Sequence, residues 1–163
     1  MNLSACLVAA ALAMAAAAPA FAKDLPPGGL TREEVMNWLQ GKGYKAELKY
    51  DETAKDNYIS TSSDGVNWSV YLYACTDSRC TSFQYSAGWD DADVSESTLN
   101  VWNRVKRFIR AYRGSTGLFG EYDFDLVPGG SWEMLDQSLV RWKSQLTAFN
   151  ELINTGNSWA NGR

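Results

Sequence analysis

The chain has 163 residues, enough for one domain of ordinary size, and its formal net charge is −4. This acidic balance, without any contiguous basic run, argues against nucleic acid as a general partner. The complete lack of histidine excludes His-based catalytic triads, imidazole metal sites and the usual general base.

Residues 1–22 are predicted to be a cleavable signal peptide. Residues 5–18 are almost entirely Ala, Leu, Val and Met, no charge precedes Lys23, and Ala20-Phe21-Ala22 fits a small-x-small cleavage site. A retained transmembrane helix is the alternative, but the apolar stretch is short for one. A lipoprotein site at Cys6 is disfavoured because too little apolar sequence precedes it. We therefore expect a periplasmic or secreted protein with no stable membrane insertion after cleavage.

The mature chain opens with a predicted linker and a helix. Residues 23–30 are rich in Pro and Gly, which is typical of a linker. Thr31 is a candidate N-cap, and Glu34 stands three positions later, which gives the capping-box pattern. Gly41 and Gly43 are expected to end this helix.

Four strands are expected next. The first two cover residues 44–51 and 57–62, and a hairpin follows around a loop at 76–79. If Cys75 faces Cys80 in that hairpin, one face is apolar in every pair: Leu72 with Phe83, Val70 with Tyr85, Trp68 with Ala87, Val66 with Trp89. The opposite face is more polar and pairs Tyr73 with Ser82 and Tyr71 with Gln84. A slip of one residue would destroy this segregation, so the register supports a Cys75–Cys80 disulfide. An even pair of cysteines in an exported chain agrees with it.

A second helix and a second hairpin follow. Ser95 is the expected N-cap of the helix, after a run of aspartates that favours a helix start. Strands are predicted near 107–113 and 118–127, with Arg110 facing Glu121 as a pair of opposite charges.

The last predicted helix starts after Ser131. Its apolar residues alternate in steps of four and three, as in a coiled-coil seam: Leu135, Leu139, Trp142, Leu146, Phe149, Ile153. Residues 154–163 are predicted to be a flexible polar tail. The fold class is then α+β, a single domain over residues 31–153 with an antiparallel or mixed sheet and the order α-β-β-β-β-α-β-β-α.

The carboxylates give two weak candidates for chemistry. The cluster Asp90, Asp91 and Asp93 lacks the spacing of an EF-hand and is interpreted as a solvated run before a helix, so no metal is expected. Glu121, Asp123 and Asp125 alternate on one strand face and would suit a glycosidase pair. The favoured interpretation of these three is a polar outer face opposite an arginine.

An aromatic and arginine cluster is the most unusual local feature. Asn103 and Arg107 stand one helical turn apart next to Trp102, and Arg110 follows. With Trp89, these residues are the candidate binding site, an anion or carboxylate clamp. The alternative, which we favour, is structural: Asn103 satisfies backbone groups at a strand end while the arginines extend to solvent.

Several stretches together resemble a known family. They are Asp64-Gly65-Val66-Asn67-Trp68-Ser69-Val70-Tyr71, then Phe83-Gln84-Tyr85-Ser86-Ala87-Gly88-Trp89, then Leu99-Asn100-Val101-Trp102-Asn103-Arg104 with Arg107-Phe108. The chain resembles the YbjN family, often labelled bacterial sensory transduction regulators, over about residues 30–153. The resemblance implies a fold similar to type III secretion chaperones, with no catalytic residues and no cofactor.

Three functions remain open on this basis. The leading hypothesis is an exported, non-enzymatic interaction module, chaperone-like or regulatory, that engages a protein or peptide. The alternatives are a periplasmic small-molecule sensor in an envelope-stress response and a carboxylate-based hydrolase. A homodimer is also open, because the seam of the last helix could be self-complementary.

Overall fold

The computed structural model describes residues 23–90 and 92–161, and the predicted signal peptide lies outside them. The fold is α+β, as predicted, with one six-stranded antiparallel sheet in the order β1-β2-β3-β4-β6-β5. The elements are α1 (Arg32–Gly41), β1 (Glu47–Asp51), β2 (Asp56–Ser63), β3 (Val66–Thr76), β4 (Arg79–Trp89), α2 (Glu96–Val105), β5 (Arg110–Arg113), β6 (Leu118–Asp125), α3 (Trp132–Thr155) and the 3-10 helix η1 (Gly156–Ala160).

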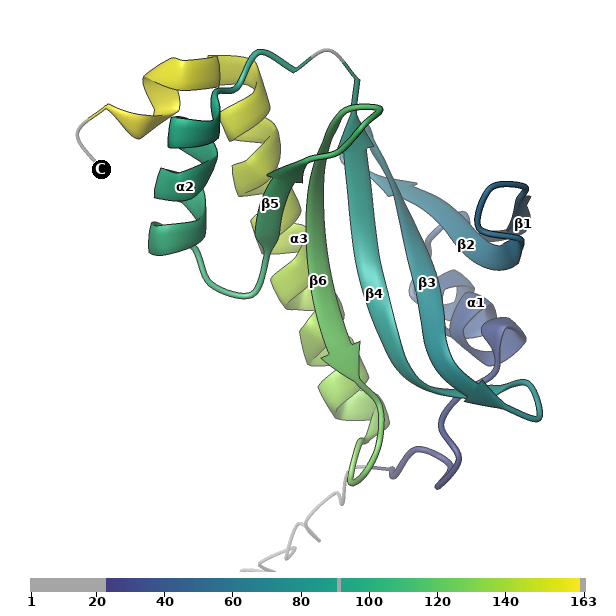
Figure 1. The fold of residues 1–163 in the computed structure, drawn as a ribbon. Helices are drawn as coiled ribbons and strands as arrows, with labels where there is room; N and C mark the ends of the chain where they lie inside the picture. The colour runs from purple at the N-terminus through teal and green to yellow at the C-terminus, as the bar shows by residue number, and fades with distance from the viewer. Residues whose placement is uncertain (1–22, 91, 162–163) are drawn as a thin grey trace, which may run out of the picture.

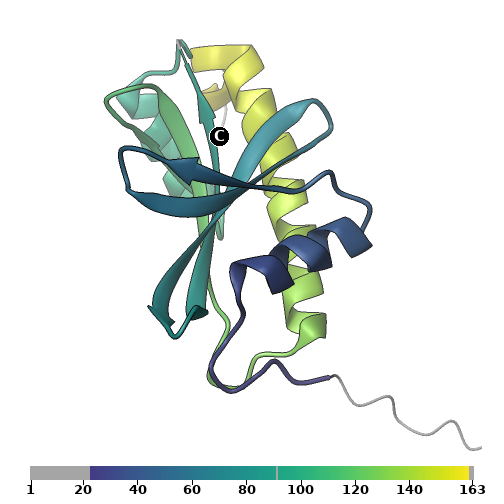
Figure 2. The same ribbon diagram turned by 90° about the vertical axis from the view of Figure 1, so that its right-hand side faces the viewer.

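The sheet has one covered face and one bare face. Helices α1 and α3 lie behind it in Figure 1, and α2 and η1 lie beyond its β5 edge. Figure 2, seen from the β1 side, places α1 and α3 on one side of the strands and the β1–β2 turn on the other. The core lies under α1 and α3; its largest fully buried side chains include Trp68, Trp102, Trp142, Tyr85, Phe83 and Phe149.

All three predicted N-caps are confirmed. Thr31 Oγ1 accepts the Glu34 N–H at 3.1 Å, and the Glu34 carboxylate accepts the Thr31 N–H at 2.9 Å, which completes the capping box. Ser95 and Ser131 accept backbone N–H groups in the first turns of α2 and α3. These caps fix where the helices begin, because each satisfies a donor that has no partner inside the helix.

The β3–β4 hairpin has the predicted register. Leu72 pairs with Phe83, Val70 with Tyr85 and Cys75 with Cys80, and the two cysteines form a disulfide. The loop is shorter than predicted, because the strands continue to Thr76 and Arg79. Only Asp77 and Ser78 remain in the turn, both with positive φ (49° and 68°), which is the backbone shape of a two-residue type I′ turn.

Replacing Cys75 by serine should lower the free energy of unfolding by about 2 kcal/mol, because the disulfide closes only a short loop. Cys75 is exposed, so the hydroxyl itself should add little. Urea denaturation followed by tryptophan fluorescence measures the change. Reduced wild-type protein should lose the same amount, and a loss under about 0.5 kcal/mol in both samples would contradict the estimate.

The β5–β6 hairpin also has the predicted register, with Arg110 opposite Glu121 and Ala111 opposite Gly120. The first strand is shorter than expected and starts at Arg110 rather than near residue 107. Phe108 explains the difference, because its φ of 72° is left-handed and interrupts an extended strand.

The apolar seam of α3 is buried against the sheet of its own chain. Leu135, Leu139, Trp142, Leu146 and Phe149 are buried as predicted. At the last position Leu152 is buried in place of Ile153, as expected for a straight helix of 3.6 residues per turn rather than a coiled coil. The seam therefore offers no surface to a second copy, and the argument for a homodimer that rested on it is lost.

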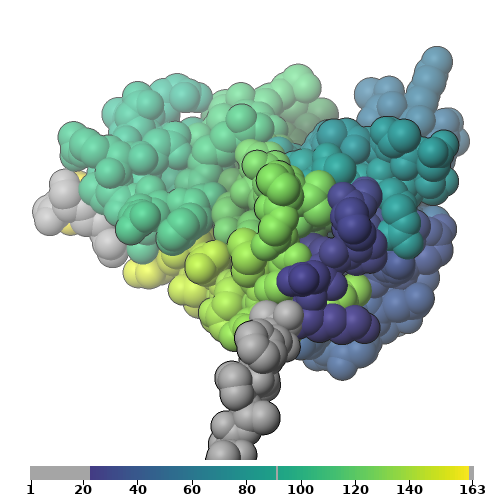
Figure 3. All heavy atoms as spheres, turned by 90° about the horizontal axis from the view of Figure 1, so that it is seen from below, coloured from purple at the N-terminus to yellow at the C-terminus, as the bar shows by residue number. Residues whose placement is uncertain are grey.

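Both ends of the described chain belong to the domain, contrary to prediction. In the segment 23–30, Leu25 and Leu30 are buried, and bridges join Asp24 to Ser131 and Leu30 to Cys80. Figure 3 shows this purple segment lying between the end of the β3–β4 hairpin and the residues that lead into α3. Beyond α3, η1 buries Trp159, which packs on Trp102 with ring centroids 5.1 Å apart. The predicted linker, and the described part of the predicted tail (residues 154–161), are thus corrected to packed segments.

Candidate functional site

The cluster around Trp102 is part of the core. Trp102 is fully buried and contacts the rings of Phe149 and Trp159 at 4.9 and 5.1 Å. The Asn103 side chain accepts the Ala111 N–H and donates to the Ala111 carbonyl, both at 2.8 Å. This is the structural role that the sequence suggested for Asn103: it hydrogen-bonds β5 at the edge of the sheet.

The other three candidates do not converge on one site. Trp89 is half-buried and packs on Phe149, on the helix-covered side. Arg107 is exposed beside Phe108, with the guanidinium 5.0 Å from the ring. Arg110 lies on the bare face, where it binds Glu121 at 2.6 Å. The structure thus gives no clamp built from these residues.

The bare face of the sheet carries aromatic side chains instead. Tyr58 stacks on Tyr71 at 5.3 Å and Tyr112 on Phe119 at 5.6 Å, while Tyr73 is 47% exposed between them along the sheet. We call this surface the tyrosine face. It is formed by strands β2, β3, β4, β6 and β5 on the side of the sheet opposite the helices. Two hollows of about 370 and 200 Å³ adjoin on it and share Tyr71, Ser86 and Phe119 in their linings.

The floor of the larger hollow is polar. Gln84, Ser86 and Glu121 are only 7 to 8% exposed there, although they point away from the helices. The β1–β2 turn forms one wall through Asp51 and Asp56. Buried polar groups at the bottom of a cleft with aromatic walls are typical of a binding surface, because they give orientation while the rings give contact area.

Glu121 is the centre of a hydrogen-bonded group in this hollow. It accepts bonds from Arg110 at 2.6 and 3.0 Å and from the Tyr112 hydroxyl at 2.8 Å. Burial and this bond raise the pKa of Tyr112 to about 12, and burial together with the Glu121 charge raises the pKa of Tyr73. Both phenols therefore stay neutral at physiological pH and can donate or accept hydrogen bonds.

The carboxylates of β6 are all placed on the polar side, but two of them are engaged. Glu121 is held by Arg110, and Asp123 accepts the Gln84 amide at 2.8 Å. Within residues 23–90 and 92–161, no group of three His, Cys, Asp or Glu side chains is arranged to hold a metal ion.

The sequence contained the signal for the tyrosine face. The expected register had already placed Tyr71 and Tyr73 on the more polar face of the hairpin, together with Gln84. Their importance was missed because pairing with the neighbouring strand β6, which adds Glu121 and Phe119, cannot be deduced from one hairpin.

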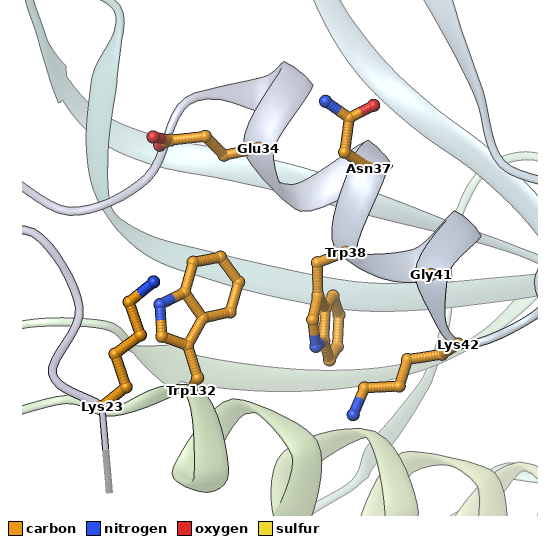
Figure 4. A pocket seen from close by; sticks show the side chains of 7 residues that line it. All are labelled: Lys23, Glu34, Asn37, Trp38, Gly41, Lys42 and Trp132. Carbon is orange, nitrogen blue, oxygen red and sulfur yellow. The ribbon is translucent and has the colours of Figure 1, made fainter.

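A separate cavity, of about 490 Å³, lies between α1 and the start of α3. Figure 4 shows its two indoles, Trp38 and Trp132, on opposite sides of the space, with Lys23 beside Trp132 and Lys42 beside Trp38. We call this cavity the indole slot; its lining residues are Lys23, Glu34, Asn37, Trp38, Gly41, Lys42 and Trp132. None of them was singled out from the sequence as a site residue.

The fold and the tyrosine face define a small α+β domain with one helix-covered and one bare sheet face. The chain belongs to the YbjN family, described as "Putative bacterial sensory transduction regulator", whose model matches residues 31–154. No curated protein and no solved structure gave a match. Among the described residues, no helix combines the length and the apolar character needed to cross a membrane.

Proposed function

We propose that the mature protein is an exported, non-enzymatic binding module that holds a segment of a partner protein on the tyrosine face. The composition of this face carries the proposal. Tyr58, Tyr71, Tyr73 and Tyr112 stand among serines, Gln84 and Gly88, with no lysine in the lining of either hollow. Protein-binding surfaces are enriched in tyrosine and depleted in lysine, and tyrosine with serine and glycine is the composition of adaptable paratopes.

The shape of the face favours a polypeptide segment. The larger hollow is bounded by the β1–β2 turn on one side and by Tyr112 and Phe119 on the other. A side chain inserted there would meet the buried amide of Gln84 and the hydroxyl of Ser86 at the floor. The exposed rings would lie along the remainder of the segment, and aromatic anchors of this kind dominate the energy of interfaces.

The charges around the hollow indicate the partner's character. Asp51, Asp56 and Glu121 line it; Glu121 is paired with Arg110 and Asp56 with Arg32, which leaves Asp51 as the lining carboxylate without an ion pair among the described residues. Complementary potentials favour association, so we expect a neutral or basic segment rather than an acidic one.

Two features support an exported, regulatory role. The residue pattern of 1–22 is that of a signal peptide, and the Cys75–Cys80 disulfide suits an oxidising compartment. The family description supports a regulatory or interaction role in general. The engagement of Glu121 and Asp123 in bonds supports a non-enzymatic protein, because a glycosidase acid must be free to give up its proton.

Replacing Tyr73 by serine should weaken binding of the partner at least about tenfold, because an exposed aromatic anchor is lost from the centre of the face. Among the described residues Tyr73 makes one side-chain hydrogen bond, a long one to Gln84 at 3.4 Å, so the fold should tolerate the change. A photoreactive phenylalanine analogue at position 73 of the exported protein identifies the partner, and calorimetry with the purified partner measures the affinity.

Val140 provides the matched control. It is 61% exposed, on α3 and therefore on the opposite side of the sheet. The same analogue there should capture no partner, and Val140→Ser should bind like the wild type. Equal capture at positions 73 and 140, or hydrolase turnover that disappears in Glu121→Gln, would contradict the proposal.

A further inference from the structure

The indole slot is separate from the tyrosine face and has its own chemistry. It lies between α1 and α3, on the covered side of the sheet, whereas the tyrosine face lies on the bare side. Trp38 belongs to α1 and Trp132 is the first residue of α3, so two elements 94 residues apart supply its walls. An open space of about 490 Å³ between two indoles is large enough for a ring system of small-molecule size.

Most polar groups of the slot already have partners. The Trp38 Nε1–H donates to Asp136 at 2.9 Å, and Lys42 binds the same carboxylate at 2.6 Å. The Glu34 carboxylate accepts two bonds from Arg79, at 3.0 and 3.1 Å. These pairs fix the walls and leave their charges neutralised.

Lys23 is the exception among the lining charges. Within the described part of the chain its ammonium makes no ion pair, although it lies beside Trp132 in Figure 4. Its backbone is fixed, because the Trp132 N–H donates to the Lys23 carbonyl at 3.0 Å and the Leu25 N–H to the Gly130 carbonyl at 2.9 Å. Cleavage after Ala22 would also create an α-ammonium group at this residue, which adds a second positive charge at the rim.

We propose that the indole slot binds a small planar aromatic anion, such as an aromatic carboxylate. The ring of the ligand lies against the indoles of Trp38 and Trp132, and its anionic group pairs with Lys23. Aromatic surfaces supply large contact area with defined geometry, and the unpaired ammonium selects a negative rather than a neutral or positive ligand. This site goes beyond the proposed function, because it requires no protein partner and shares no residue with the tyrosine face.

Calorimetry with the mature protein, residues 23–163, tests the proposal with 2-naphthoate and its neutral amide, 2-naphthamide. We expect one molecule of 2-naphthoate to bind with a dissociation constant below about 1 mM, and the amide to bind at least about fivefold more weakly. Lys23→Gln should remove most of the preference for 2-naphthoate over the amide, because only the α-ammonium group of residue 23 then remains near the anionic group of the ligand. Trp132→Ala should weaken both ligands about tenfold, because both lose a ring contact.

Two variants serve as controls. Lys49→Gln removes an exposed lysine of β1 outside the slot and should leave both affinities unchanged. Tyr73→Ser should also bind 2-naphthoate normally, which separates this site from the tyrosine face. If circular dichroism shows that Trp132→Ala is unfolded, the proposal is tested by two other results: the affinities for 2-naphthoate and 2-naphthamide, and the effect of Lys23→Gln on them. Absence of saturable binding, equal affinity for acid and amide, or no effect of Lys23→Gln would overturn the proposal.

Discussion

Replacing Trp102 by alanine should lower the free energy of unfolding by about 4 kcal/mol, the usual cost of emptying a buried aromatic site. Trp102 is fully buried between Phe149 of α3 and Trp159 of η1, so its loss opens a cavity that three segments share. Urea denaturation monitored by circular dichroism measures the change. A loss of this size would leave little of the stability of an ordinary domain.

The matched control for this prediction is Arg107→Ala. Arg107 was a candidate binding residue from the same sequence cluster, but it is exposed. Its replacement should change the stability by less than about 0.5 kcal/mol. A Trp102→Ala protein that kept its stability and lost only partner binding would contradict the structural role and make Trp102 a binding residue.

Replacing Gly29 by alanine should cost about 3 kcal/mol or more and release the segment 23–30 from the domain. Gly29 has a φ of +85°, and a Cβ there would lie 1.9 Å from the carbonyl oxygen of Cys80. That oxygen accepts the Leu30 N–H at 3.0 Å, so it cannot move away without breaking the bridge. Trypsin should then cleave after Arg32 much faster than in the wild type, and denaturation should show the lower stability.

The neighbouring glycine supplies the comparison. A Cβ at Gly28 would lie 3.4 Å from the flexible Arg79 side chain, an ordinary contact, so Gly28→Ala should change stability by less than about 1 kcal/mol. Equal, small effects of the two substitutions would mean that the segment is the loose linker that its composition suggests.

The elements and hairpin registers could be predicted because their information is local. Leu72, Val70, Phe83 and Tyr85 alternate with polar residues, and a slip of one residue in the pairing would separate them onto opposite faces. Capping residues such as Thr31 mark helix starts for the same reason, since the bond partner is three residues away.

Contacts between distant segments could not be predicted in this way. Residues 23–30 were interpreted as a linker from their composition alone, but Leu30 pairs with Cys80 and is fully buried. The candidate cluster failed for a related reason: helical spacing placed Asn103 and Arg107 on one side, but α2 ends at Val105, and the sequence could not show that α3 and η1 cover Trp102. The indole slot was missed because Trp38 and Trp132 meet only after the sheet has brought α1 and α3 together.

The two edges of the sheet differ in a way that limits how copies of this protein can join. At the β5 edge, the Asn103 side chain already occupies both the N–H and the carbonyl of Ala111, as a neighbouring strand would. The β1 edge, at the opposite end of the sheet, pairs only with β2 among the described strands. An additional strand can therefore pair along the whole of β1, whereas at β5 its pairing is blocked at Ala111. Two copies joined through β1 would each present the β5 edge outward, where Asn103 opposes the addition of a third copy, so this arrangement favours a closed pair over a fibre.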